Sequence, residues 1–346
     1  MTFQPQRYPV GIQTFSEIIE GRYLYIDKTD LVWKLANAAK FIFLSRPRRF
    51  GKSLLTTTLK SYFEGRRDLF EGLKIMPLEQ EWKQYPVIHL DMSTCKGAES
   101  SMELRQKLLL QMLPYTELYG TVDAETTPGG QLAGCIRRAC IQTGEKVVVI
   151  IDEYDAPLLE VMHEQENLAA MRKVMQEFYQ PLKACESMIR FCFLTGITKF
   201  SQLSIFSTLN NIMNLSMDTE FATICGITEQ EMETRMSDGI DALAEEYECS
   251  RDEMLQRLRL KYDGYHFAKN SDGVYNPYSL MYCFARRDMK NYWFESGTPT
   301  FLFNQMRRFG TDITKMDDIT ASEESFYMPT ETLTDALPLL YQAGYL

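Results

Sequence analysis

The sequence predicts an α/β fold, in which helices flank a mostly parallel β-sheet and a smaller, mainly helical domain follows. Short, continuous apolar runs recur at residues 40–45, 85–93, 146–155 and 189–201, and such runs are typical of strands that are buried on both faces of a sheet. Segments with the helical spacing of apolar residues separate them, and strands that alternate with helices form parallel sheets. Beyond about residue 226, helical segments with acid-rich exposed faces replace the strands.

The sheet domain is predicted to span residues 1–226, and the helical or winged-helix-like domain residues 227–346. In the first domain we expect helices within 23–39 (capped by Thr29 or Asp30), 51–65, 101–113, 131–144 and 167–185, with a kink or break at Pro181. In the second domain we expect helices over 228–247, 250–262, 276–288 and 298–310. The chain ends on the apolar segment "LLYQAGYL", and because termini are usually polar we expect a C-terminally truncated protein.

The composition excludes several classes of protein. With 45% hydrophobic and 24% charged residues, the 346-residue chain is globular rather than disordered. Its net charge of −10 argues against non-specific coating of nucleic acid, because the mean field repels phosphate. None of the 8 cysteines forms a C-x-x-C pair, so we expect reduced thiols rather than a zinc site. Neither a signal-peptide core nor an apolar run of about 18 residues is present, so we expect a cytoplasmic protein with no membrane partner.

The stretch "FIFLSRPRRFGKSLL" contains a phosphate-binding loop of unusual form. Gly51-Lys52-Ser53 follows a predicted strand and opens a predicted helix, the order that a P-loop requires, but the usual first glycine is replaced by Arg46. The N–H groups at a helix N-terminus attract an anion, Lys52 would reach the β- and γ-phosphates, and Ser53 would ligate Mg²⁺. The alternative is a solvent-facing turn that contains Gly-Lys-Ser by chance.

We assign nucleotide contacts to the whole loop and the first turn of the helix. These residues are Arg46, Pro47, Arg48, Arg49, Phe50, Gly51, Lys52, Ser53 and Leu54. Pro47 biases the preceding residue towards extended geometry, so we expect a negative φ at Arg46 and a loop path that differs there from that of a glycine-bearing loop. Arg48 or Arg49 would add charge at the phosphates or pair with nearby acids.

The segment "VVVIIDEYD" supplies the acidic half of the predicted site. Asp152 directly follows an apolar strand and is the expected ligand of Mg²⁺ through water, and Glu153 would polarise the attacking water as general base. The alternative is a strand that enters an exposed acidic loop, which Asp155 and Glu160 would suit. Together with the P-loop, in this order, the acids predict a P-loop NTPase site for ATP and Mg²⁺.

The Asp-Glu pair also carries topological information. P-loop proteins of this type (ASCE) insert an extra strand between the strand before the P-loop and the strand before the acids, and that strand presents a polar residue to the γ-phosphate. Here the fourth predicted strand ends at Thr195, followed by Thr198, Lys199 and Ser201. Thr195 is our candidate sensor of the γ-phosphate, and its alternative role is a strand-end cap.

Several segments together resemble the AAA-ATPase-like family of bacterial proteins over essentially the whole chain. They are "GIQTFSEIIEGRYLYIDKTDLV", "FLSRPRRFGKSLL", "HLDMS", "IIDEYDAPL", "FLTGITKFSQLSIFSTLNNIMNLS", "KYDGYHF" and "YNPYSL". The resemblance implies ATP binding in a P-loop domain, followed by a helical and winged-helix-like region. In this family the arginine-bearing P-loop is the normal form, and members commonly carry a further C-terminal domain that resembles PD-(D/E)XK nucleases and is missing here.

Two further family motifs allow two interpretations each. In "YIDKT", Tyr25 would stack on the base, with Asp27 or Lys28 bonded near it, or the segment is a helix entry packed on the sheet. "KYDGYHF" is either a packed turn or a nucleotide contact. Arg286, Arg287, Arg307 and Arg308 are either solvated helix ends or a source of charge at the transferring phosphoryl group, in cis or in trans.

These predictions lead to one function with two alternatives. We expect a Mg²⁺-dependent ATPase whose nucleotide state regulates an attached effector or a partner. The first alternative is a switch that holds nucleotide and scarcely hydrolyses it. The second is the ATPase subunit of a nuclease-linked system, in which nucleic acid would act through the missing C-terminal domain. A homo-oligomer would let a neighbour supply the arginine.

Overall fold

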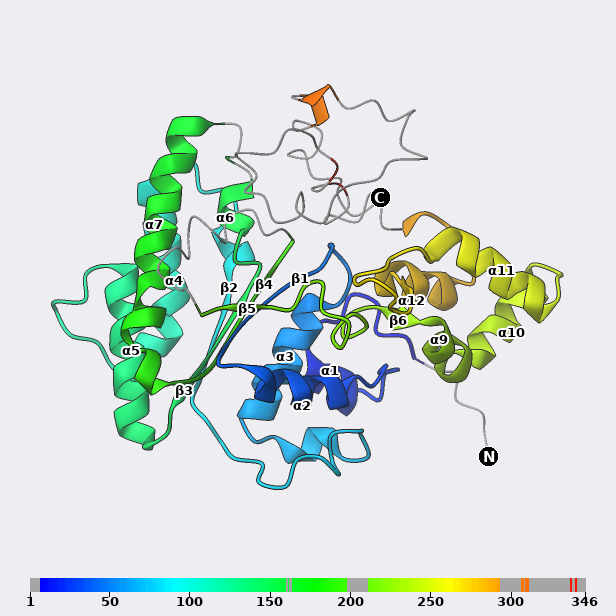
Figure 1. Ribbon diagram of the computed structural model, residues 1–346, viewed down its shortest axis with the longest axis horizontal. Helices are drawn as coiled ribbons and strands as arrows, with labels where there is room; N and C mark the ends of the chain where they lie inside the picture. The colour runs from blue at the N-terminus through cyan, green and yellow to red at the C-terminus, as the bar shows by residue number, and fades with distance from the viewer. Residues whose placement is uncertain are drawn as a thin grey trace. The chain divides into compact units, whose positions relative to one another are not determined.

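Five strands form one sheet in the order β2-β3-β4-β1-β5 (Figure 1). The strands are β1 (Phe41–Ser45), β2 (Val87–Asp91), β3 (Val147–Asp152), β4 (Ile189–Gly196) and β5 (Met213–Asn214). The pairs β2–β3, β3–β4 and β4–β1 are all parallel. An α/β fold with a parallel sheet is therefore confirmed, and four strands lie within the four apolar runs that predict them.

The computed structural model describes residues 7–159, 161, 164–197, 211–292, 306–307, 309–310, 337 and 340. The chain divides into two compact units that alternate along the sequence. The sheet unit is Ala39–Pro47, Gln84–Met213 and Pro299–Leu346, and the helical unit is Met1–Ala38, Arg48–Lys83 and Asn214–Thr298. The border between domains at 226/227 stays a prediction, as do the winged-helix-like part and the helix over 298–310, most of which lies outside the described residues.

In the sheet unit, β1 and β3 are buried on both faces of the sheet, and β4 is buried except at Arg190. On one face, Phe43, Ile88 and Val149 belong to the core that packs with the helices of this unit. Their neighbours Val148 and Phe193, on the opposite face, are equally inaccessible. Burial on both faces favours apolar side chains, which explains why these strands read as continuous apolar runs. The edge strand β2 is only partly buried on one face, where it carries His89.

Three long helices of the sheet unit pack side by side, as Figure 1 shows for α4, α5 and α7. The helices and short 3₁₀ turns here are η2 (Met92–Cys95), α4 (Ser101–Tyr119), α5 (Pro128–Thr143), α6 (Ala156–Leu159), α7 (Gln165–Ala184) and η3 (Glu186–Met188). Ser100 caps α4 and Thr127 caps α5, each by accepting a main-chain N–H. Two expectations were wrong: α4 continues past residue 113 through Pro114, and α7 continues through Pro181 without the predicted break. A kink at Pro181 stays a prediction.

The helical unit contains two groups of elements. The first is α1 (Phe15–Glu20), α2 (Thr29–Ala38), α3 (Lys52–Phe63) and η1 (Arg67–Phe70), and the second is β6 (Ile227–Thr228), α9 (Glu229–Arg235), α10 (Ser237–Glu246), α11 (Arg251–Tyr262), β7 (Val274–Tyr275) and α12 (Pro277–Arg286). The predicted single helix over 228–247 was wrong, because the chain forms two helices that meet at Met236. The second group has its own core, which includes Met232, Leu243 and Leu280.

The start of α2 corrects the predicted helix cap. Asp27, rather than Thr29 or Asp30, accepts hydrogen bonds from the main-chain N–H and the hydroxyl of Thr29, at 2.9 and 2.6 Å. Its second oxygen accepts the N–H of Lys74 at 2.8 Å. Asp27 therefore holds the helix entry, which is the structural interpretation of this part of "YIDKT".

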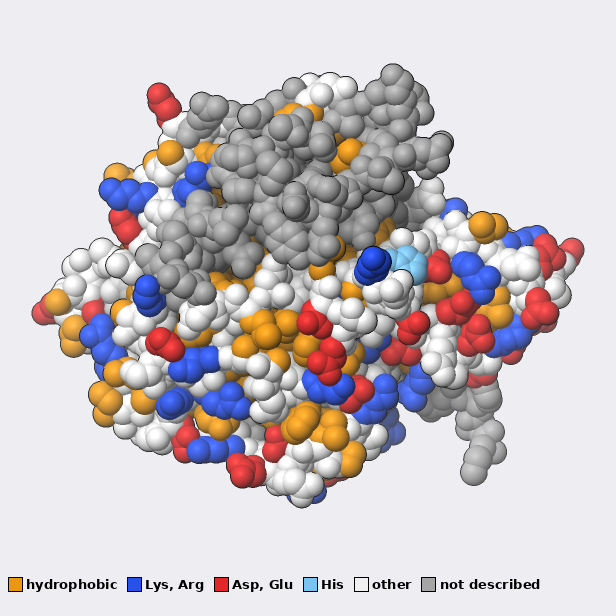
Figure 2. Space-filling model, viewed as in Figure 1, with side chains coloured by type: hydrophobic (Ala, Val, Ile, Leu, Met, Phe, Trp, Pro, Cys, Tyr) orange, Lys and Arg blue, Asp and Glu red, His pale blue; other side chains and the backbone are white. Residues whose placement is uncertain are grey.

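The redox state of the cysteines and the distribution of charges on the surface are those that the composition predicts. All eight cysteines are free thiols. None of the described helices is both long and apolar enough to cross a membrane. On the face drawn in Figure 2, acidic and basic side chains of the described residues are interspersed, so this face presents no uniform basic field.

Gly196, at the end of β4, is the glycine whose replacement tests the packing around the predicted site. A Cβ added there would lie 2.5 Å from Asp155 Oδ1 and 2.6 Å from a ring carbon of Tyr154. Because both groups are buried, they have little room to move. We expect Gly196→Ala to lower the free energy of unfolding by about 1–3 kcal/mol, the usual cost of overpacking. Urea unfolding measures it, and wild-type stability would show that the two side chains can shift.

Candidate functional site

Polar residues occupy the carboxyl ends of four adjacent strands in the sheet unit. Asp91 at the end of β2 pairs in register with Asp152 at the end of β3. Next along the sheet, Thr195 and Gly196 at the end of β4 pair with Leu44 and Ser45 at the end of β1. Ligands of open α/β sheets bind outside the carboxyl ends of the strands, so this edge is the candidate site.

The strand order confirms the topological prediction. β4 lies between β1, which leads into the Gly-Lys-Ser loop, and β3, which ends in the two acids. The extra strand is therefore the one that ends at Thr195.

Asp152 and Glu153 differ in how the backbone presents them. Asp152 is 3% exposed, and its Oδ1 accepts the N–H of Glu153 at 2.9 Å. Glu153 has a φ of +47°, the left-handed region that non-glycine residues seldom adopt. Its half-buried carboxylate forms an ion pair with Lys96. The left-handed backbone of Glu153 ends the extended path of β3 directly after Asp152.

The next two residues bind the acidic turn to β4. The N–H of Tyr154 donates to the carbonyl of Thr195 at 3.0 Å, and Asp155 Oδ2 accepts the N–H of Ile197 at 3.2 Å. Asp155 is completely buried. The alternative of an exposed acidic loop is therefore wrong for Asp152 and Asp155. Sequence reasoning missed the structural role of Asp155, although the apolar "APLL" that follows it was a signal of burial.

Thr195 has its hydroxyl engaged within the sheet. The Oγ1 donates a 2.7 Å hydrogen bond to the carbonyl of Leu44 on β1, and the residue is fully buried. This contact is the strand-end role weighed for Thr195. Its role as a sensor of the γ-phosphate stays a prediction, which requires the hydroxyl to change its acceptor.

Arg46 continues the pairing of β1 with β4 instead of opening a wide glycine turn. Its N–H donates to the carbonyl of Gly196 at 3.2 Å, its guanidinium donates to the carbonyl of Ser45 at 2.8 Å, and it is 1% exposed. Arg46 is absent from the described residues with positive φ, which confirms its predicted negative φ. The left-handed residues of the loop are instead Arg49, at +68°, and Gly51, at +90°.

The start of α3 has the form of an anion-binding helix terminus. Gly51 is the N-cap residue, no side chain caps the helix, and no atom lies within 4 Å of the position that a Cβ would take there. Lys52 is 6% exposed, while Ser53 and Leu54 are half-buried. Arg46 and Pro47 belong to the sheet unit and residues 48–54 to the helical unit. That Lys52 and Ser53 form one site with Asp152 and Glu153 therefore stays a prediction.

Arg49 and Phe50 anchor the loop on aromatic residues of the helical unit. The guanidinium of Arg49 lies 4.6 Å from the ring centre of Tyr278 on α12. Phe50 packs edge-on against Tyr265 at 4.6 Å and Phe267 at 5.3 Å. "KYDGYHF" therefore forms a packed turn. A contact of Arg48 or Arg49 with phosphate stays a prediction.

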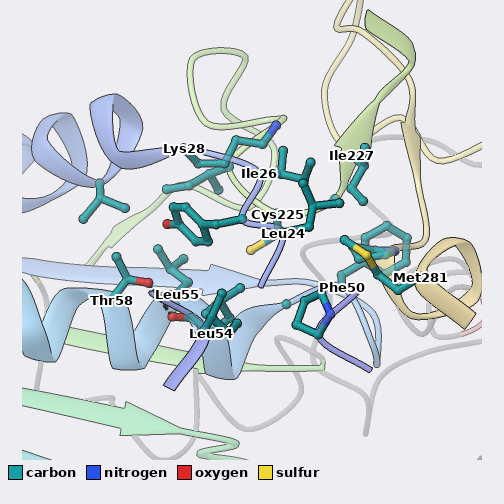
Figure 3. Close-up of a pocket in the computed structure, with 18 residues that line it drawn as sticks. Leu24, Ile26, Lys28, Phe50, Leu54, Leu55, Thr58, Cys225, Ile227 and Met281 are labelled. Atoms are coloured by element: carbon teal, nitrogen blue, oxygen red, sulfur yellow. Dashed lines mark hydrogen bonds between the residues drawn. The ribbon is translucent and has the colours of Figure 1, made fainter. Parts of the chain in front are cut away.

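A pocket opens beside Gly51 within the helical unit (Figure 3). Its empty volume, open mouth included, is about 600 Å³. The wall is mainly apolar and comes from three segments: the N-terminal stretch, the first turns of α3, and residues around β6 and α12. It includes Tyr25, Lys28, Leu54, Thr58, Cys225 and Met281. Of these residues, the sequence predicted Tyr25 and Leu54 as nucleotide contacts, with Lys28 as one interpretation of "YIDKT". The others converge on the pocket only through the fold.

Tyr25 and Lys28 are the polar members of the pocket wall from "YIDKT". The ring of Tyr25 is 8% exposed and packs edge-on against Phe15 at 5.2 Å, and burial raises the pKa of its hydroxyl. Burial lowers the pKa of Lys28, while the carboxylate of Glu231, 2.6 Å from its Nζ, acts in the opposite direction. The same carboxylate accepts the N–H of Thr228 and completes the capping box of α9. Lys28 thus links the pocket wall to α9.

Comparison with known proteins assigns the family. A family described as "Predicted AAA-ATPase" matches residues 9–206, more than half of the chain. The chain belongs to this family of predicted AAA-ATPases. The match spans the Gly-Lys-Ser loop, both acids and Thr195.

A curated relative of this AAA-ATPase-like chain comes from Azotobacter chroococcum mcd 1 and is named "Uncharacterized protein in vnfD 5'region". The two are 33% identical over 344 residues, which cover 99% of this chain and 64% of the relative. The chain thus spans about two thirds of the length of the relative that it matches.

Proposed function

We propose that this AAA-ATPase-like chain binds Mg²⁺ and ATP at the carboxyl edge of its sheet and hydrolyses the nucleotide. The observation that carries the proposal is the strand order: β4 separates the strand that leads to Gly51-Lys52-Ser53 from the strand that ends in Asp152 and Glu153. The family, described as predicted ATPases, supports it. Exchange of Glu153, argued in the Discussion, is the experiment that tests it.

We assign each side chain a role from its chemistry. Lys52 and the N–H groups at the start of α3 would neutralise phosphate charge. Glu153 would take a proton from the attacking water, and Thr195 would donate to the γ-phosphate after leaving its present acceptor, Leu44. The aromatic contacts of Arg49 and Phe50 hold the loop that leads into Lys52.

The oxygen ligands present fit Mg²⁺. Among the described residues, no cluster of His, Cys, Asp and Glu could hold a metal ion alone. Mg²⁺ in phosphate sites is bound by one or two carboxylates, hydroxyls and the substrate phosphates, and it keeps several waters. Ser53 and the buried carboxylate of Asp152 supply such oxygens. The bound ion would neutralise charge on the transferring phosphoryl group.

The pocket beside Gly51 is the proposed place of the nucleobase. Its apolar wall suits an aromatic ring, as ligand pockets usually combine apolar lining with a few polar groups. Tyr25 and Lys28 supply those polar groups. Gly51 belongs to both the pocket wall and the N-terminus of α3, which supports a base position next to the proposed phosphate position within the helical unit.

Met281→Trp should block this pocket. The larger ring would occupy space from the α12 side and leaves the Gly-Lys-Ser sequence unchanged, so we expect at least a tenfold loss of ATP affinity, about 1.4 kcal/mol or more. Binding of inorganic tripolyphosphate, which lacks a base, should change less than twofold by the same measure. Isothermal titration calorimetry measures both ligands, with the exposed Met102→Trp as control. Equal losses for ATP and tripolyphosphate would contradict the assignment of the base.

A slowly hydrolysing nucleotide switch is the second candidate. Two contacts favour it: the carboxylate of Glu153 is paired with Lys96, and the hydroxyl of Thr195 is bonded to the main chain. For either candidate, we also propose that the nucleotide state regulates an effector or a partner. We propose in addition that the protein forms homo-oligomers and is cytoplasmic. Phosphate release that stops after about one turnover per chain would favour the switch, and sustained release would favour the ATPase.

A further inference from the structure

We propose that Tyr265 and Phe267 are positioning residues for phosphate binding: they hold Phe50, and through it the Gly-Lys-Ser loop, in the shape that receives an anion. The inference rests on the proposed function and gives a role to the motif "KYDGYHF". The residues concerned all belong to the helical unit, although more than two hundred residues of sequence separate the loop from the motif.

The loop turns sharply on both sides of Phe50, and this turn needs support. Arg49 and Gly51 both have left-handed backbone, with φ of +68° and +90°. Arginine adopts this conformation at a cost in free energy, because its Cβ comes too close to the following carbonyl oxygen. No side chain caps the start of α3. Packing of Phe50, the residue between the two, can offset this cost.

Two aromatic side chains, which we call the aromatic clamp, provide that packing. The ring centre of Phe50 lies 4.6 Å from that of Tyr265 and 5.3 Å from that of Phe267, with interplanar angles of 72° and 84°. Tyr265 and Phe267 are themselves stacked, with their ring centres 6.4 Å apart. Edge-to-face contacts favour one ring orientation and add to the gain from burial. Phe50 is 1% exposed, so its ring has little room to leave the clamp.

The aromatic clamp is attached to the rest of the helical unit through β7. The carbonyl of Tyr265 accepts the N–H of Val274 at 3.0 Å, and Val274 pairs with Thr228 of β6. Val274 is fully buried and packs closely on Gly226, where an added Cβ would lie 2.8 Å from it. The clamp is therefore part of a paired and buried framework, which can serve as a fixed support for the loop.

The position of Phe50 determines where the proposed phosphate-binding groups lie. Phe50 directly precedes Gly51, the N-cap residue of α3, and the buried Lys52 follows. A site whose donors already have their bound geometry loses less conformational freedom when the ligand binds, so its affinity is higher. Phe50 also lines the pocket proposed for the base (Figure 3), but Tyr265 and Phe267 are not among the described residues of that wall. Exchange of the clamp residues therefore tests the loop and leaves the residues of the pocket wall unchanged.

The test is calorimetric titration of the whole chain with tripolyphosphate and with ATP, both with Mg²⁺, after Tyr265→Leu and after Phe267→Leu. Each variant removes one aromatic contact of Phe50 and keeps an apolar side chain. We expect both ligands to bind about two- to tenfold more weakly, the equivalent of one lost aromatic pair. The factor should be the same for both ligands, because the clamp acts on the phosphate side. Tyr265→Phe, which keeps the ring, should retain the wild-type affinity.

Trp82→Leu is the matched control, because Trp82 packs edge-on against Tyr62 at the opposite end of α3. It should leave both affinities within about twofold of wild type. Hydrogen exchange gives a second readout that needs no nucleotide. In the ligand-free protein, the amides of residues 48–54 should exchange at least about threefold faster in Tyr265→Leu and at the wild-type rate in Trp82→Leu.

Each outcome decides a different question. Wild-type affinity for tripolyphosphate, or wild-type exchange of residues 48–54, in folded clamp variants overturns the inference and leaves the proposed function intact. A loss confined to ATP, or an equal loss in Trp82→Leu, also overturns it. If the wild-type chain binds neither ligand, the proposed function and the positioning role are rejected together. Should Tyr265→Leu fail to fold in a thermal melt, Phe267→Leu and Tyr265→Met decide, with the same expected losses.

Discussion

Glu153→Gln should bind ATP with nearly wild-type affinity and lose steady-state hydrolysis by about 10²–10⁴-fold, the contribution of a positioned general base. The amide has the shape of the carboxylate but cannot take a proton from water. The backbone should tolerate the exchange, because its hydrogen bonds around Glu153 run through main-chain atoms and Asp152. Phosphate release measures turnover, and calorimetry measures affinity.

Glu186→Gln is the matched control, since Glu186 lies in the same unit with an exposed side chain paired to Lys40. It should leave both binding and turnover unchanged. Hydrolysis by Glu153→Gln at the wild-type rate would refute the general-base assignment. Loss of ATP binding in Glu153→Gln would instead show that this carboxylate acts in nucleotide or metal binding.

Lys52→Ala should lose ATP affinity by about 10- to 150-fold, the equivalent of one charge-assisted hydrogen bond of roughly 1.5–3 kcal/mol. The ammonium is the cation that opens α3 directly after Gly51, where the helix terminus already favours an anion. Because Lys52 is buried, Lys52→Met is measured beside it to separate the loss of charge from the loss of packing. Calorimetry with ATP gives the affinity of both.

Lys60→Ala serves as the control on the same helix, because Lys60 is exposed and pairs with Glu64 at 3.8 Å. Its affinity for ATP should equal that of wild type. If Lys52→Met is folded and binds ATP as tightly as wild type, Gly51-Lys52-Ser53 does not form a phosphate-binding loop.

The strands of the sheet could be predicted because each one is an apolar run that is recognisable within a few consecutive residues. Burial of β1, β3 and most of β4 on both faces favours continuous apolar runs, and apolar runs predicted all four parallel strands that the structure pairs. Helix ends were less predictable. Pro114 and Pro181 lie inside long helices, although proline usually ends or kinks a helix. Met236 divides a segment whose periodicity predicts one helix.

The polar residues of the candidate site could be identified from the sequence, but the residues that they contact could not. Lys96 and Glu153 are far apart in sequence, and no local pattern couples a lysine after one strand to an acid after the next. The stacking of Arg49 on Tyr278 likewise depends on α12, which follows more than two hundred residues later. Such contacts depend on how strands and helices are arranged in space, which residue spacing alone does not specify.

The central claim is that Gly51-Lys52-Ser53 and Asp152-Glu153 form one Mg²⁺-ATP site. A crystal structure of the Glu153→Gln protein with Mg²⁺ and ATP tests it most directly. We expect the phosphates at the N-terminus of α3, the base in the pocket beside Tyr25, and Mg²⁺ at about 2.1 Å from Ser53 Oγ, with Asp152 bound to it directly or through one water. Nucleotide bound elsewhere, or Mg²⁺ in contact with neither Ser53 nor Asp152, would contradict the claim.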